Sequence, residues 1–227
     1  MGYLPRPVQS YFANQHLEGF SLDYAVEKRP LGTAGGIKNA EEYLNEGPFV
    51  ATNGDVLTGI DLTEIIEAHM ESGALATITL TAVDDPPTHG LVEVHHRLRV
   101  KRFVEKPGSE EVHTSLINAG IYVLERQILN VIPTEREGSI EREIFPQLQA
   151  MERLSAFVSS AYWLDIRTPC SYLAASNDML SGAGRCEIEA GATISGRTSI
   201  GEGCFVGEDT MVEGIILFGG VWVGRER

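Results

Sequence analysis

The sequence predicts an α/β protein in which a mostly parallel β-sheet covered by helices is followed by a short all-β region. Strand-like and helix-like patterns alternate over residues 1–182, and this alternation is typical of a largely parallel sheet with helices on both faces. After Ser181-Gly182-Ala183-Gly184 the alternation stops and a six-residue period begins. We therefore expect two domains, residues 1–182 and residues 183–227.

The elements expected early in the chain differ in their periodicity. Residues 21–28 have apolar side chains at alternate positions and predict an extended strand, and residues 33–44 follow a helical pattern. Residues 48–55 form a short apolar strand that ends in a turn. Apolar residues recur at helical spacing over residues 62–73, and residues 74–83 are rich in β-branched side chains, which favour a buried strand.

The middle of the chain predicts a hairpin and further alternating elements. Residues 91–96 and 99–106 are expected to pair as two antiparallel strands, and residues 117–125 form another strand. A helix that Pro146 could kink or split, a short strand and a second helix complete the domain: residues 139–151, 162–166 and 169–180.

A six-residue repeat occupies the end of the chain. Aliphatic residues recur in phase, with Phe218 continuing the register, and a small residue stands four positions after each of the first four: Ile188, Ile194, Ile200, Val206 and Val212, with Ala192, Thr198, Cys204 and Thr210. This period fits neither a helix nor an ordinary strand. It predicts a hexapeptide-repeat left-handed β-helix, in which each aliphatic side chain points into a narrow prism. The alternative is a glycine-rich all-β tail with accidental spacing.

Composition and charge exclude several classes of protein. The 227 residues are 43% hydrophobic and 22% charged, which suits an ordinary globular core. The net charge of −14, without a cluster of Lys and Arg, argues against a nucleic-acid partner. No apolar run reaches transmembrane length, and the first residues do not resemble a signal peptide. Three cysteines without a CxxC spacing predict unpaired thiols, and we expect a cytoplasmic protein without a membrane partner.

Four segments contain polar residues that could carry chemistry. Asp55 follows an apolar strand in Asn53-Gly54-Asp55, and its carboxylate could bind Mg²⁺, although this sequence is also common in turns. Asp165 ends a second apolar strand, where a helix cap is the more frequent role. Glu105-Lys106 ends a third strand, and the pattern alone favours a solvated strand end. Asn118 lies among apolar residues, so its amide requires hydrogen-bonding partners.

Taken together, six segments resemble a known family. They occur in the order LGTAGG, NGD, HGLVEV, FVEKP, NAGIYVLE and YWLDIRTP, and hexapeptides follow them. Their order and spacing resemble the sugar-1-phosphate nucleotidylyltransferases over essentially the whole chain, and most of all the bacterial mannose-1-phosphate guanylyltransferase branch. The resemblance implies a Rossmann-like sheet of the nucleotide-diphospho-sugar transferase type, followed by the β-helix.

The resemblance also implies roles for individual residues. The glycine-rich turn would lie against the nucleotide base, where a backbone without Cβ atoms can approach closely: Gly32, Thr33, Gly35 and Gly36. The catalytic set would combine two Mg²⁺ ligands with a cation that meets the sugar phosphate: Asp55, Asp165 and Lys106. The sugar hydroxyls would be bound by a third group: Glu105, Asn118 and Gly90.

The implied reaction joins a nucleoside triphosphate and a sugar 1-phosphate. A sugar-phosphate oxygen would attack the α-phosphorus in line, and pyrophosphate would leave. The protein would contribute positioning and charge neutralisation, with Mg²⁺ as the cofactor. A second copy of the chain could pack against the β-helix.

Two departures from the family pattern bear on activity. A strand and a GGxGTRL loop that open the family's domain are absent from this sequence, and Arg167 stands where the family has glycine in DIGTP. We therefore expect a chain that lacks the first strands of the sheet, whether a fragment, a mis-started gene or a degraded copy, with very low turnover of GTP and mannose 1-phosphate. A non-catalytic regulatory or scaffolding homologue and an acyltransferase stay open as alternatives.

Overall fold

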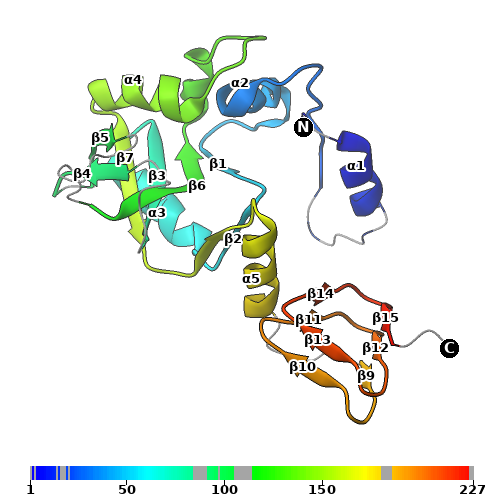
Figure 1. The fold of residues 1–227 in the computed structure, drawn as a ribbon. Coiled ribbons are helices and arrows are strands. Elements are labelled where there is room, and N and C mark those ends of the chain that lie inside the picture. The colour runs from blue at the N-terminus through cyan, green and yellow to red at the C-terminus, as the bar shows by residue number, and fades with distance from the viewer. Residues whose placement is uncertain are drawn as a thin grey trace. The chain divides into compact units, whose positions relative to one another are not determined.

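The computed structural model describes residues 2, 4–13, 15, 19, 21–83, 91–96, 98–104, 114–179 and 186–224 (Figure 1). The chain divides into two compact units. The first consists of Met1–Asn53 and Ile60–Ala161, and the second of Gly54–Gly59 and Tyr162–Arg227. In the part of the chain described, no helix has the length and apolar character needed to cross a membrane.

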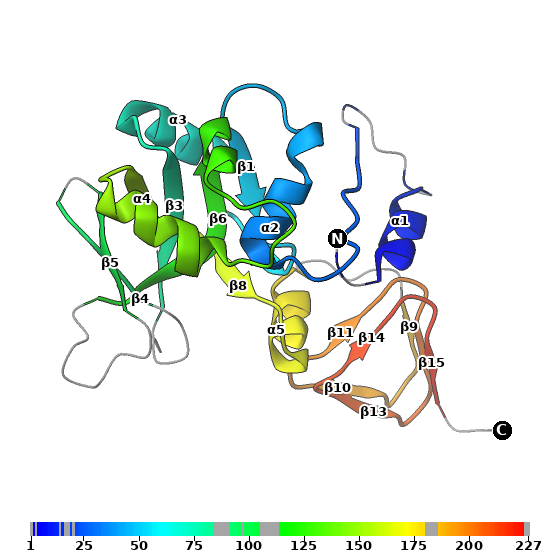
Figure 2. The same cartoon turned by 90° about the horizontal axis from the view of Figure 1, so that it is seen from above.

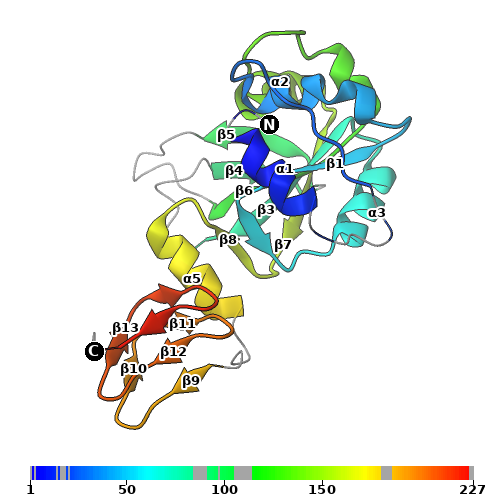
Figure 3. The same ribbon diagram turned by 90° about the vertical axis from the view of Figure 1, so that its right-hand side faces the viewer.

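A six-stranded sheet forms the centre of the first unit. Its strands are ordered β5-β4-β6-β3-β7, with β1 paired to β6, and Figure 3 shows β4, β6, β3 and β7 side by side. Their bounds are β1 (Phe49–Thr52), β3 (Ala76–Ala82), β4 (Leu91–Val94), β5 (Val100–Val104), β6 (Leu116–Leu124) and β7 (Leu154–Ser159).

This sheet is mixed, so the prediction of a mostly parallel sheet is wrong. Only β3 and β7 pair in parallel among the described strands of the sheet, whereas β6 runs antiparallel to β1, β3 and β4, and β4 runs antiparallel to β5. From β3 to β6 no helix is described between successive strands. Parallel neighbours need a long crossover, and among the strands after β3 only β7 follows described helical segments that can supply one.

The helical segments of the first unit mostly lie where the sequence predicts them. α3 (Leu62–Ser72) begins after Asp61, whose carboxylate accepts a hydrogen bond from Thr63 N at 2.8 Å, and it ends at Gly73 in the left-handed conformation. The remaining helical bounds are α1 (Pro5–Ala13), α2 (Gly32–Asn39), η1 (Glu41–Tyr43), η3 (Arg126–Asn130), the π-helical η4 (Ile140–Ile144) and α4 (Phe145–Ala150).

Three expectations of local structure differ from the observed elements. Residues 21–28 form no strand in the described structure, whereas the sequence reading missed the α1 helix and the β7 strand. The helix predicted over residues 139–151 is present, but in two adjoining segments: the π-helical η4 ends at Ile144 and α4 begins at Phe145, just before Pro146. Proline is tolerated there because the first helical amides have no intrahelical acceptor.

Helices cover both faces of the sheet, as the sequence predicts. Alternate side chains of β3 point to opposite faces. Ile78 and Leu80 belong to the core cluster that includes Phe145 of α4. Thr77 faces the other way and contacts His69 of α3 through a 2.8 Å hydrogen bond.

The second unit begins with a two-stranded ladder. β2 (Val56–Thr58) pairs antiparallel with β8 (Trp163–Asp165), and α5 (Pro169–Met179) follows. Seven short strands then form three small parallel sheets, β10-β13, β11-β14 and β9-β12-β15, which Figure 2 shows as the sides of a triangle. Their bounds are β9 (Glu187–Ile188), β10 (Thr193–Ser195), β11 (Ser199–Ile200), β12 (Phe205–Val206), β13 (Met211–Glu213), β14 (Ile216–Leu217) and β15 (Trp222–Val223).

The repeat positions are buried in the middle of this region only. Val206 and Val212 are buried together with Cys204, as predicted. Ile188 and Ile194, in the first two strands of this region, are 48% and 37% exposed.

The predicted continuation of the register at Phe218 is wrong. Ile200 pairs with Leu217, one residue short of three periods, so Leu217 is buried and Phe218 is 62% exposed. The turn of chain between these paired strands is therefore one residue shorter than the repeat predicts.

Candidate functional site

The two acidic residues predicted to share a metal ion lie at the same end of the β2–β8 ladder. Val56 is paired with Asp165, and Ile166 N donates a hydrogen bond to the backbone oxygen of Asp55 at 2.9 Å. The backbones of Asp55 and Asp165 are therefore neighbours although 110 positions separate them in the chain. Asp55 lies in the turn before β2, so the pleat of the ladder does not fix the direction of its side chain.

Arg167 engages both carboxylate oxygens of Asp165. The backbone N of Arg167 donates to Asp165 Oδ1 at 3.2 Å, and its Nε lies 2.6 Å from Oδ2. The Asp165 side chain is 19% exposed, whereas the Arg167 side chain is 63% exposed. The ion pair thus joins a half-buried carboxylate to a guanidinium that remains largely in solvent.

The donor types at this position fit Mg²⁺. Magnesium ions in proteins are held by one or two carboxylates, and waters and substrate phosphates complete the coordination. Asp55 and Asp165 supply two carboxylates, and the described residues contain no group of three or more His, Cys, Asp or Glu side chains placed to hold a metal. A cation bound here would take the remaining oxygens from water and phosphate, and it would meet Arg167 as a competitor for Asp165.

The glycine-rich turn is held tightly against the protein's own backbone. Ala34 N donates to Gly138 O at 3.0 Å, and Gly138 N donates to Leu31 O at 2.9 Å. A Cβ atom at Gly32, where φ is +67°, would overlap Gly138 O, and a Cβ atom at Gly35 would come within 2.7 Å of Arg136 O. Packing of α2 on residues 136–138 therefore requires these two glycines, whether or not a ligand approaches them.

Gly36 differs from the other two glycines. A Cβ atom there would meet only a carboxylate oxygen of Glu27, at 3.3 Å, which is the end of a flexible side chain. The protein's own packing does not require glycine at position 36.

A carboxylate that the sequence reading missed joins the glycine-rich turn to β6. Thr33 Oγ1 and Ser139 Oγ donate to Glu141 Oε2 at 2.8 and 2.7 Å, and Tyr122 OH donates to Oε1 at 3.1 Å. Asn118 Nδ2 donates to Tyr122 OH at 2.9 Å. We call these residues the Glu141 cluster: Thr33, Asn118, Tyr122, Ser139 and Glu141. It unites two predicted site residues, Thr33 and Asn118, within the first unit.

The environment of Tyr122 keeps its hydroxyl protonated. Burial raises the pKa of Tyr122 well above its usual range, and the nearby Glu141 carboxylate raises it further. A protonated hydroxyl can donate to Glu141 while it accepts from Asn118. The Asn118 amide is held at its other end as well, because Gly120 N donates to Asn118 Oδ1 at 2.9 Å.

A surface hollow of about 500 Å³ lies beside this cluster. Its lining comes from the glycine-rich turn and from the segment that packs on it: Gly32, Thr33, Glu137, Gly138, Ser139, Glu141, Arg142 and Glu143. The turn therefore borders a concave surface, as a base-binding role would need.

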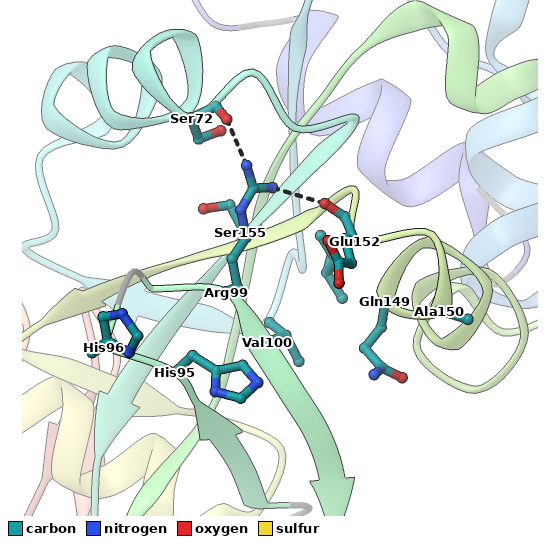
Figure 4. Close-up of a pocket in the computed structure, with 10 residues that line it drawn as sticks. Ser72, His95, His96, Arg99, Val100, Gln149, Ala150, Glu152 and Ser155 are labelled. Atoms are coloured by element: carbon teal, nitrogen blue, oxygen red, sulfur yellow. Dashed lines mark hydrogen bonds between the residues drawn. The ribbon is translucent and has the colours of Figure 1, made fainter.

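A larger hollow of about 720 Å³ in the first unit contains none of the predicted site residues (Figure 4). Arg99 crosses it, and its terminal nitrogens donate to the backbone oxygens of Ser72 and Glu152 at 2.8 and 3.2 Å. Arg99 thus joins the end of α3 to the turn that contains Glu152. In Figure 4 His95 and His96 lie below the guanidinium, which extends toward Ser72 and Glu152, so the three side chains do not converge on one point.

Comparison with known proteins identifies the family. A family model described as "Nucleotidyl transferase" matches residues 3–182. The chain belongs to this family. The resemblance that the six segments predicted is thereby confirmed.

Curated relatives include mannose-1-phosphate guanylyltransferases from several organisms. The Mycobacterium tuberculosis protein of that name is 34% identical over 97% of this chain and 66% of its own length. Mannose-1-phosphate guanylyltransferase 1 of Arabidopsis thaliana is 36% identical over 88% of this chain and 58% of its own length. The chain thus spans roughly three-fifths of these relatives.

Solved structures support the same fold. The crystal structure of HddC from Yersinia pseudotuberculosis aligns with a TM-score of 0.66 at 29% identity, covering 77% of this chain and 74% of that one. A second HddC structure, described as complexed with GMP-PN, aligns with a TM-score of 0.65 at 28% identity.

The predicted site residues fall into three groups. Gly32, Thr33, Gly35, Gly36 and Asn118 lie in the first unit, and Asp55 and Asp165 lie in the second. Gly90, Glu105 and Lys106 lie outside the described residues. No sequence pattern indicated Glu141. It is one of two acidic residues near the start of η4, and acidic residues are common in the first turn of a helix.

Proposed function

We propose that the chain is a sugar-1-phosphate nucleotidyltransferase of the GDP-mannose type. It would take GTP and mannose 1-phosphate and form GDP-mannose and pyrophosphate. Family membership and the names of the curated relatives support the reaction class. The observation that carries the proposal is the β2–β8 pairing, because it makes neighbours of the two acidic residues that such a reaction needs at the α-phosphate.

Each group of residues would have one task. The glycine-rich turn would border the base, Asn118 with Glu105 and Gly90 would bind the sugar, and Lys106 would meet the sugar phosphate as a point charge. Asp55 and Asp165 would hold Mg²⁺, which when bound neutralises charge on the triphosphate. A sugar-phosphate oxygen would form the new bond to the α-phosphorus while the bond to pyrophosphate breaks. The protein would hold both reactants in line and would need no covalent intermediate.

The protein would be cytoplasmic, and its second unit would pack against a second copy of the chain. We assign its three parallel sheets to a left-handed hexapeptide-repeat β-helix, since strands three periods apart are paired. Phe205 and Trp222 stack with ring centroids 4.7 Å apart, and Trp222 is 77% exposed. An exposed aromatic residue of this kind suits contact with a second copy.

Ligand binding tests the proposal without requiring turnover. Titration calorimetry with GDP-mannose, and with GTP in the presence of Mg²⁺, is expected to show saturable binding of both. ADP-glucose and UTP should bind at least about tenfold more weakly, a difference of about 1.4 kcal/mol. Equal binding of all four ligands, or of none, would contradict the GDP-mannose assignment.

The second candidate is a non-catalytic member of the same family. The contact of Arg167 with both oxygens of Asp165 favours it, since an arginine there occupies a carboxylate that the metal would use. The two candidates differ in the effect of the metal. Binding of GTP that strengthens with Mg²⁺ favours the enzyme, and binding that ignores Mg²⁺ favours the non-catalytic homologue.

A further inference from the structure

Arg167 occupies a fixed loop between β8 and α5. Ile166 is anchored on one side by its hydrogen bond to Asp55 O. On the other side Thr168 and Ser171 bond reciprocally, with Ser171 N donating to Thr168 Oγ1 at 3.1 Å and Thr168 N donating to Ser171 Oγ at 3.0 Å. This arrangement is a form of helix cap and holds the backbone on both sides of Arg167.

The side chain of Arg167 can therefore change partner without any movement of the loop backbone. Its backbone N bonds to Asp165 Oδ1 through the turn, whereas its guanidinium contacts Oδ2 and is otherwise largely exposed. Any side chain at position 167 other than proline retains the first contact, but only a long cation makes the second. The ion pair and the turn are thus separable by substitution.

We propose that Arg167 competes with the divalent cation for Asp165 and so keeps the metal affinity of the ligand-free protein low. This rests on the proposed function, because it takes Asp55 and Asp165 as the metal ligands. A cation that binds Asp165 must displace the guanidinium from Oδ2 and approach a positive charge that stays nearby. Both effects oppose metal binding, and both vanish when position 167 is neutral.

The size of the effect follows from the exposure of the pair. Ion pairs with one largely exposed partner contribute little because water and salt screen them. We expect Arg167→Gln to tighten Mn²⁺ binding about fivefold, which corresponds to about 1 kcal/mol. Arg167→Lys keeps the charge and should stay within about twofold of the wild-type affinity.

Electron paramagnetic resonance titration of free Mn²⁺ against the ligand-free protein measures this affinity directly. The matched control is Arg197→Gln, which removes an equal charge from an exposed position in the same unit. Circular dichroism checks that all variants are folded. We expect tighter binding in Arg167→Gln and wild-type binding in Arg197→Gln. Asp165→Asn added to Arg167→Gln should cancel the gain.

Two results would overturn the proposal, and they are distinguishable. If Mn²⁺ binds in a manner that depends on Asp165 but Arg167→Gln leaves the affinity unchanged, the competition is absent while the metal site stands. If Asp165→Asn has no effect on Mn²⁺ binding in any background, the metal site of the proposed function fails together with the competition. Equal gains in Arg167→Gln and Arg197→Gln would reduce the effect to net charge and likewise reject the proposal.

Discussion

Two carboxylates, Glu141 in the first unit and Asp165 in the second, are held by different kinds of partner. Glu141 accepts hydrogen bonds from three hydroxyl groups, and one of them belongs to a buried tyrosine. Asp165 is bound by one guanidinium, which is 63% exposed. Loss of the acceptor for the buried Tyr122 hydroxyl would leave a polar group without a partner, which is costly, whereas an exposed cation exchanges readily. Under the proposed function, the first would belong to a preorganised region for base and sugar, and the second to an exchangeable one for the metal.

The largest expected effect concerns the glycines of the first unit. Gly32→Ala and Gly35→Ala should each lower the free energy of unfolding by about 3 kcal/mol, because the added methyl group overlaps backbone at residues 136–138. Gly36→Ala is the control, and it should change stability by less than about 1 kcal/mol. Urea denaturation measures all three, and equal losses in the three variants would show that packing does not explain these glycines.

The second prediction compares the two carboxylates directly. Glu141→Gln should destabilise the protein by about 1–2 kcal/mol, because an amide cannot accept from all three hydroxyls. Asp165→Asn should cost less than about 1 kcal/mol, because its main partner is largely exposed. Thermal and urea denaturation provide the values. A larger loss in Asp165→Asn than in Glu141→Gln would reverse the comparison.

A smaller effect concerns a buried histidine. His69 is 1% exposed, and its Nε2 lies 3.5 Å from Glu125 Oε1 without a hydrogen bond. Burial lowers the pKa of His69 and outweighs the opposing effect of Glu125. The unfolded chain then takes up a proton first as pH falls below about 6.5, and stability decreases by up to about 1.4 kcal/mol per pH unit.

His69→Gln isolates this pH dependence. The variant loses the titrating group but retains a polar side chain that can contact Thr77. Urea midpoints measured from pH 7.5 to 5.5 should fall more steeply for the wild type than for His69→Gln. Identical slopes would show that His69 does not titrate differently in the folded state.

The order of the six sequence segments was enough to predict the family. Residue patterns within single segments predicted most of the helices and their placement on both faces of the sheet. These features depend on local patterns and short motifs, and each is visible within a few residues. The mixed sheet was not predictable in the same way, because β6 has apolar residues on both faces whether its neighbours are parallel or antiparallel. The repeat correctly predicted that Val206 and Val212 are buried and wrongly predicted the same for Phe218, because one missing residue shifts the register of every later position.

The site was predictable only in part for a related reason. Asp55, Asp165, Thr33 and Asn118 lie in segments with a recognisable order. Glu141 contacts Thr33, which is 108 positions away in the chain, and Tyr122 of β6, and nothing in its own segment indicates those contacts. The glycines show the converse, because a close approach was predicted but the observed neighbour is the protein's own backbone.

The proposal that Asp55 and Asp165 together hold one metal ion is tested most directly by Mn²⁺ binding. Mn²⁺ affinity is measured in Asp55→Asn, Asp165→Asn and the double variant, with circular dichroism to confirm folding. If both carboxylates hold one ion, each single substitution weakens binding about tenfold or more, and the double variant is little worse than the weaker single one. Wild-type affinity in either single variant would contradict the proposal, because an ion held by both carboxylates must bind more weakly when one of them is removed.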